Sequence, residues 1–146
     1  MATAAYQLEV LEEDGQVLWH LPVRPGATVI LTYTNSLYNA PTEEFFTVTT
    51  RGFVLTDVRS TSDAVLEHNM LPGPYVKDGP YFVSATRVAV PSIVTRIGQT
   101  GQQRLIVGSR TLPLYDIGVG GQVTVVVQRI PLIRQIKQAV WRGRTP

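Results

Sequence analysis

The chain of 146 residues is long enough to form one domain that buries about 70% of the surface exposed by its unfolded chain, so it needs no disulfide or metal to fold. It contains no cysteine, which excludes disulfides, thiolate metal sites and a cysteine nucleophile. Its net charge of +2 is too small to indicate a nucleic-acid binder, and we expect no nucleic-acid partner.

A β-hairpin is predicted at the start of the chain. The segments Tyr6–Leu11 and Gln16–His20 resemble strands in composition, and Glu12–Gly15 between them ends in Asp-Gly, whose two residues tolerate positive φ. Pro22 and Pro25-Gly26 follow. Because proline cannot donate to a sheet ladder, we expect Pro22 and Pro25-Gly26 to end the second strand and to turn the chain into the central segment.

Residues 29–48 place polar, acidic and aromatic side chains between two strongly apolar strands. In the first strand, residues 29–34, period-two alternation puts Val29, Leu31 and Tyr33 on one face. The link from Asn35 to Pro41 is predicted to be a formed loop. Its asparagines and serine bond backbone groups readily, so they are candidates for simple turn residues.

The second strand of this segment, residues 43–48, carries a carboxylate and an aromatic ring on each face. Glu44 shares one face with Phe46, and Glu43 shares the other with Phe45. Carboxylates on opposite faces cannot act as paired acid and base on one substrate, which argues against a glycosidase.

The next strand is predicted from Phe53 to Ser60, after a tight turn at Arg51-Gly52. Alternation divides it into two faces, one with Val54, Thr56 and Val58 and the other with Leu55, Asp57 and Arg59. The shared face of Asp57 and Arg59 predicts an ion pair between them, worth little if exposed.

The segment from Thr61 to Pro80 is predicted to be a long loop, because periodicity fails there and prolines and glycines interrupt it. Its apolar residues indicate packing rather than disorder. A short helical turn is expected around Asp63 to His68, with Ser62 or Asp63 as its N-cap.

Further strands are predicted at Tyr81–Val90, Ile93–Ile97, Arg104–Val107 and Gln122–Ile130, with a short edge segment at Thr111–Tyr115 that contains Pro113. About eight to ten short strands without long helical patterns predict an all-β fold, an antiparallel β-sandwich or barrel over residues 1–131.

Residues 132–146 form a separate basic tail. Leu132, Ile133, Ile136 and Val140 fall near helical spacing among basic residues, which predicts a short C-terminal helix. Three interpretations stay open: a helix that covers an open end of the sheet, a peripheral contact with an anionic membrane or a partner, and a frayed terminus.

Catalytic and metal-binding signatures are missing from the sequence. His20 and His68 have no metal-ligand spacing, no Gly-x-Ser-x-Gly elbow is present, and the glycines at 118, 120 and 121 do not open a helix. We therefore expect a protein that is not an enzyme and that needs no metal or cofactor.

A family resemblance rests on the central segment. Tyr33-Thr34-Asn35-Ser36-Leu37, followed by Ala40–Phe46, resembles the pattern of a prokaryotic domain family of unknown function, roughly Tyr-x-His-Ser-Val, a short gap, then Thr-Pro-Val-x-Glu-x-Phe. Later blocks are similar in the same order: Leu71-Pro72, Asp78–Tyr81, Leu105–Gly108 and Leu112–Leu114. The resemblance covers roughly residues 6–130.

The resemblance implies an accessory role in solute uptake. Members are often encoded beside tripartite ATP-independent periplasmic (TRAP) transporters with a TAXI-type solute receptor, which implies a TRAP membrane subunit or solute receptor as partner. Members commonly begin with an apolar segment, whereas Met1–Ala5 is too short for a signal peptide. The protein is then either extracytoplasmic and membrane-anchored, with its anchor missing from this sequence, or cytoplasmic if the chain is complete as given.

Two positions depart from the family pattern, Asn35 in place of His and Thr42 in place of Val. Asparagine does not titrate near neutral pH, so a family role that needs an imidazole proton is not expected here, although Asn35 can still form hydrogen bonds. Ser36 and Glu44 match the pattern. The candidate binding residues are Tyr33, Asn35, Ser36, Tyr38 and Glu44.

We expect a non-enzymatic accessory or binding module whose loop from Asn35 to Glu44, beside the loop Thr61–Pro80, contacts a TRAP component or a small solute. The alternatives are a small-molecule-binding β domain and a hydrolytic enzyme that uses Glu44 and Ser36. In a purely structural interpretation, Glu44 brackets the loop by accepting backbone N–H groups and Ser36 closes a turn.

Overall fold

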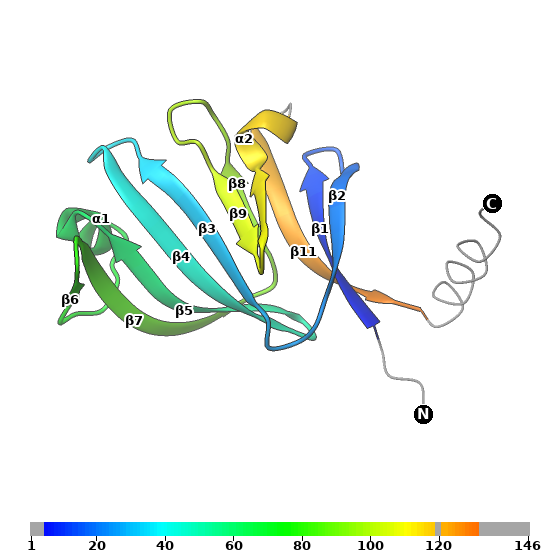
Figure 1. Cartoon of the computed structure of the whole chain (residues 1–146), viewed down its shortest axis with the longest axis horizontal. Coiled ribbons are helices and arrows are strands. Elements are labelled where there is room, and N and C mark those ends of the chain that lie inside the picture. The colour runs from blue at the N-terminus through cyan, green and yellow to red at the C-terminus, as the bar shows by residue number, and fades with distance from the viewer. Residues whose placement is uncertain (1–4, 119–120, 132–146) are drawn as a thin grey trace.

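The computed structural model describes residues 5–118 and 121–131, which fold into two antiparallel sheets packed face to face (Figure 1). One sheet has the order β2 (Val17–Val23), β1 (Ala5–Glu12), β11 (Gln122–Ile130), β8 (Ile93–Arg96). The other has the order β10 (Arg110–Pro113), β9 (Arg104–Val107), β3 (Thr28–Asn35), β4 (Ala40–Thr49), β5 (Gly52–Ser60), β7 (Tyr81–Val90), β6 (Val76–Asp78). Two short helices, α1 (Asp63–His68) and α2 (Leu114–Ile117), lie at the ends of strands. The all-β sandwich is confirmed, with eleven strands in the described residues rather than eight to ten, and without barrel closure among them.

The core lies between the two sheets and takes side chains from both. Leu8, Val10, Val123 and Val125 come from the smaller sheet, and the larger sheet contributes the residues opposite them: Val29, Leu31, Phe46, Val48, Phe53 and Leu105. Phe46 and Phe53 meet edge to face, with ring centroids 6.0 Å apart. Burial of these apolar side chains is the main force that holds the sheets together.

The N-terminal hairpin is confirmed, with its turn in the predicted place. Gly15 adopts φ +88°, and the Gln16 N–H donates to Asp14 Oδ1 at 2.9 Å. The second strand ends before Pro25-Gly26, where the chain turns as predicted and Gly26 adopts φ +94°, but Pro22 does not end it, because β2 continues to Val23 and pairs Pro22 with Gln7. Since β2 is the edge strand of its sheet, a residue without an N–H is tolerated there.

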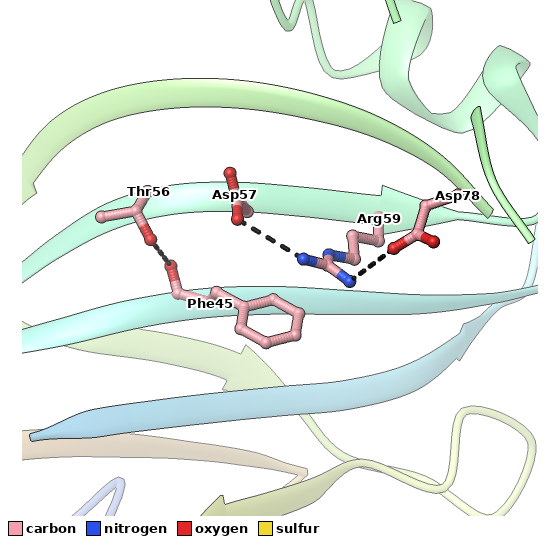
Figure 2. Close-up of polar contacts among 5 residues, drawn as sticks. All are labelled: Phe45, Thr56, Asp57, Arg59 and Asp78. Atoms are coloured by element: carbon pink, nitrogen blue, oxygen red, sulfur yellow. Dashed lines mark hydrogen bonds and ion pairs between the residues drawn. The ribbon is translucent and has the colours of Figure 1, made fainter. Parts of the chain in front are cut away.

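The predicted faces of β5 are partly wrong because of a β-bulge. β4 pairs Phe45 with Asp57 and Phe46 with Leu55, so Thr56 is the extra residue. Its hydroxyl donates to the Phe45 carbonyl at 3.2 Å (Figure 2). The bulge shifts the alternation, so Leu55 lies on the core side with Val58, opposite to Asp57.

The long loop is packed only in part: the expected helix α1, with Ser62 as its N-cap, buries Val65 and Leu66, whereas most of the remaining residues are exposed, Met70 among them. The short strand β6 was not predicted. Arg59 connects β6 to β5, because its guanidinium lies 3.3 Å from Asp78 and 3.7 Å from Asp57 (Figure 2). The same guanidinium lies over the Phe45 ring, 4.7 Å from its centroid, so the predicted Asp57–Arg59 ion pair belongs to a larger cluster.

At the C-terminal side, β10 lies at the edge of its sheet, as its proline predicts, while α2 was not predicted. The predicted helix in residues 132–146 lies outside the described residues. In the described part of the chain, no helix has the length and apolar character to cross a membrane.

Candidate functional site

The central hairpin β3–β4 places Tyr33 and Glu44 together on the inner face of the larger sheet. β3 and β4 pair Leu31 with Glu44 and Tyr33 with Thr42, so Tyr33 and Glu44 are diagonal neighbours on the same face. The Tyr33 hydroxyl donates a hydrogen bond to Glu44 Oε2. A carboxyl and a phenol are thus paired on a face that is otherwise mostly apolar toward the core.

Burial changes the protonation behaviour of both groups. Loss of solvation raises the pKa of the Glu44 carboxyl, and the hydrogen bond from Tyr33 opposes part of this rise. Burial, the negative charge of Glu44 and their hydrogen bond all raise the pKa of the Tyr33 hydroxyl above its ordinary value. Tyr33 is therefore neutral at physiological pH, whereas Glu44 takes up a proton at a higher pH than an exposed glutamate.

A cavity of about 280 Å³ lies beside this pair, between the β3–β4 hairpin and the edge strand β8. We call it the Glu44 pocket. It is lined by Leu31, Tyr33, Thr34, Asn35, Ser36, Glu44, Val94, Thr95, Arg96 and Gln103. The β3–β4 link and the loop between β8 and β9 reach the same end of the sandwich (Figure 1). The structure thus brings together four of the five candidate residues, Tyr33, Asn35, Ser36 and Glu44.

Asn35 is a turn residue as well as a pocket residue. Its side-chain oxygen accepts the N–H groups of Leu37 and Tyr38, each at 3.1 Å. These bonds form an Asx-turn, as expected if Asn35 is a simple turn residue. Ser36 is exposed and lies in the turn at residues 36–39, but within the described residues its side chain makes no hydrogen bond that closes this turn. Glu44 accepts the Tyr33 hydroxyl rather than the backbone N–H groups that bracketing of the loop requires, so that structural interpretation is wrong for Glu44.

Tyr38 lies apart from the pocket. Its ring meets the His68 ring of α1 edge to face, with the centroids 6.1 Å apart. This contact places the long loop beside the β3–β4 link, as expected, but it directs Tyr38 toward α1 rather than toward Glu44.

Arg96 and Gln103 were missed at the level of sequence. Arg96 ends β8 at the rim of the pocket, where it is exposed. Gln103 follows the loop that joins β8 to β9, and this loop is fixed to β3 by a bond from the Thr34 N–H to the Gly101 carbonyl at 2.8 Å. The polar run Gln99–Gln103 indicates a surface loop, but only the order of strands in the sheets shows that this loop lies beside β3.

Two other hollows lie away from Glu44. Glu43 lines one of about 280 Å³ with Tyr81 and Arg104, so the two adjacent glutamates do serve opposite faces, as predicted. The larger hollow, of about 900 Å³, lies at the other end of β3, and we call it the apolar groove. Its lining is mainly aliphatic, and Arg24 is the charged residue among its lining residues.

Within residues 5–118 and 121–131, no three histidine or acidic side chains gather closely enough to hold a metal ion. Comparison of the chain with protein-family models, with curated proteins and with solved structures found no match in any of the three. The functional argument therefore rests on the geometry of the pocket.

Proposed function

We propose that this protein is a non-enzymatic binding module that holds a small polar molecule in the Glu44 pocket. The observation that carries the proposal is the partly buried Tyr33–Glu44 pair beside a cavity, on a face that otherwise packs apolar side chains. Concave sites with a few convergent polar groups are typical of small-molecule binding.

Burial of this pair is unfavourable for folding alone. Removing a carboxyl and a phenol from water costs free energy that one mutual hydrogen bond offsets only in part, so an apolar pair of similar size would pack at least as well. By contrast, the buried hydroxyls of Thr42 and Ser60 lie 3.0 Å apart and bond each other without bordering the Glu44 pocket. A ligand that forms a hydrogen bond with Glu44 would offset the cost of burying the carboxyl, which explains why a polar pair lies at this position.

The pocket composition supports binding over catalysis. Its lining contains no histidine, and its one carboxyl, Glu44, accepts the Tyr33 hydroxyl and bonds no serine within the described residues, so Ser36 lacks the hydrogen-bonded base that activates a hydroxyl nucleophile. The hydrolytic alternative, with Glu44 and Ser36, is the less favoured proposal. The association with a TRAP transporter, and with it the extracytoplasmic location, stays a prediction.

The test is a thermal-unfolding screen of the purified protein against sugars, amino acids, small carboxylic acids and polyamines. A bound ligand at about 100 times its Kd adds about 2.7 kcal/mol to the free energy of unfolding. For a chain of this length, that raises Tm by about 5 to 10 °C.

Two matched variants locate the site. Ser36 and Ser109 are both exposed, but Ser36 lines the Glu44 pocket and Ser109 lines the apolar groove. Ser36→Trp fills the pocket and should abolish the ligand-induced rise in Tm, whereas Ser109→Trp should preserve it. The proposal is overturned if no compound raises Tm, or if the rise survives Ser36→Trp.

A further inference from the structure

We infer that the Glu44 pocket recognises a small carboxylate, an inference that rests on the proposed function. The argument starts from the hydrogen bonds that the polar side chains of the pocket already make. A group whose acceptors are occupied offers a ligand only its donors, which restricts the chemistry that it can bind.

The side-chain amide oxygens of the pocket, and one oxygen of Glu44, already accept hydrogen bonds from the protein. Asn35 Oδ1 accepts two backbone N–H groups, and Gln103 Oε1 accepts the Gly98 N–H at 3.0 Å. Glu44 Oε2 accepts the Tyr33 hydroxyl. Within the described residues the NH₂ groups of these two amides bond no protein group, so each is a donor open to a ligand.

The charges that line the pocket also favour a carboxylate ligand. The titratable and charged side chains that line the pocket around Glu44 are Tyr33 on β3 and Arg96 on β8. Arg96 forms no ion pair with any described residue, and its guanidinium can pair with a carboxylate through two parallel bonds. When Glu44 is protonated, the pocket carries one positive charge and Glu44 becomes a further donor.

Other ligand classes fit this inventory less well. A cationic amine brings only N–H donors, which cannot pair with the free amide NH₂ groups, and it meets the charge of Arg96, so its attraction depends on ionised Glu44. A sugar brings as many hydroxyl donors as acceptors, so several of its O–H groups remain unpaired, at a cost for each buried one. A carboxylate brings only acceptors.

Glu44 makes this recognition dependent on pH. Ionised Glu44 repels a carboxylate, so affinity should rise as the pH falls through the raised pKa of Glu44, while Tyr33 stays protonated throughout. A cationic ligand would show the opposite trend, because it gains from the ionised carboxylate. The sign of the pH dependence therefore separates the two classes.

The experiment is calorimetric titration of the whole chain with acetate, lactate and succinate at about pH 6 and about pH 8, where these acids are ionised. Lactamide, methylamine and inorganic phosphate serve as comparison probes. We expect at least one carboxylate to bind, and to bind more tightly at the lower pH. Lactamide and methylamine should not bind, and phosphate should bind more weakly than the carboxylate.

Three variants assign the effect. Arg96→Gln should weaken carboxylate binding by at least about tenfold, because a charge-assisted pair is lost. Glu44→Gln should keep the binding and remove its pH dependence. Arg24→Gln, in the apolar groove, should change neither.

The outcomes separate this inference from the proposed function. Binding of methylamine or a sugar in place of carboxylates, with sensitivity to Ser36→Trp, overturns the carboxylate inference and leaves the binding module standing. Carboxylate binding that Arg24→Gln weakens and Arg96→Gln does not overturns both. Equal affinity for phosphate and carboxylates, or a pH dependence of carboxylate affinity that survives Glu44→Gln, overturns the inference.

Discussion

At the scale of single residues, Glu44 is a partly buried carboxyl whose loss of solvation is unfavourable for folding. It lies on the inner face of the sheet with one bond to the Tyr33 hydroxyl, and burial raises its pKa. The sequence predicts that the Glu44 and Tyr33 side chains face the core, because period-two alternation places both on the apolar side of their strands. Their contact depends on the register of β3 and β4, which a short link leaves little freedom to change.

The raised pKa predicts how stability changes with pH. The folded protein binds the Glu44 proton more tightly than the unfolded chain does, so the stabilisation is fully present below the unfolded pKa and is lost as the pH rises through the folded pKa. Each unit of difference between the two pKa values corresponds to about 1.4 kcal/mol. Glu44→Gln should remove this loss, so its stability relative to the wild type should increase with pH.

Urea unfolding of wild type and Glu44→Gln at about pH 5 and about pH 8 measures the effect, because other titrating groups are common to both proteins. Glu43→Gln is the matched control, since Glu43 lines the hollow on the opposite face. A stability difference between wild type and Glu44→Gln that stays constant with pH would contradict the role given to Glu44.

At the scale of elements, local patterns predicted most strands but not the bulge in β5. The turns at Asp14-Gly15 and Arg51-Gly52 can be predicted locally, because these residue types favour turn conformations. The same holds for prolines at strand edges, because proline lacks an N–H. Thr56 carries no such signal, because a strand with one extra residue has the same composition as a regular strand. Only its pairing with β4 shows that two residues oppose one.

Gly52 gives a prediction at this scale, because it joins the β4–β5 hairpin to the end of β7. Its φ is +148°, and a Cβ there would lie 2.5 Å from the Val90 carbonyl oxygen and 2.9 Å from Pro91 Cα. These are backbone atoms that cannot move without disturbing the β5–β7 pairing. We expect Gly52→Ala to lower the free energy of unfolding by at least about 3 kcal/mol.

Urea unfolding checks this value against Gly98→Ala as the matched control. Gly98 has open space where its Cβ would be, so alanine there should change stability by no more than about 0.5 kcal/mol. Equal effects of the two substitutions would show that the close approach at Val90 does not constrain the fold.

At the scale of the whole molecule, the Glu44 pocket exists only because two sheets meet. Tyr33 and Glu44 come from one sheet and Thr95 and Arg96 from the edge of the other. Strand alternation specifies which residues face inward, but it does not specify that β8 pairs with β11 and lies beside β3. For this reason the pocket residues on β3, β4 and their link could be predicted from the sequence, whereas those on β8 and Gln103 could not.

Because both sheets share one core, we expect the two sheets to unfold in a single transition. Leu8 on β1 is fully buried in that core, and Leu8→Ala should cost about 2 to 5 kcal/mol through lost contacts and the cavity left behind. In a Trp141→Phe background, which leaves Trp19 as the single tryptophan, fluorescence of Trp19, which packs against the core from the smaller sheet, and far-ultraviolet circular dichroism, which reports both sheets, should shift together in urea.

Val94→Ala on the exposed side of β8 is the control for this experiment, and it should change stability by no more than about 0.5 kcal/mol. Separate transitions for the two probes in Leu8→Ala would mean that the sheets fold independently. The pocket between them would then open without global unfolding, and a ligand in it would stabilise the contact between the sheets rather than the whole fold. Coincident transitions tie occupancy of the pocket to the stability of the entire sandwich, since a ligand that bridges β3 and β8 then binds only the folded molecule.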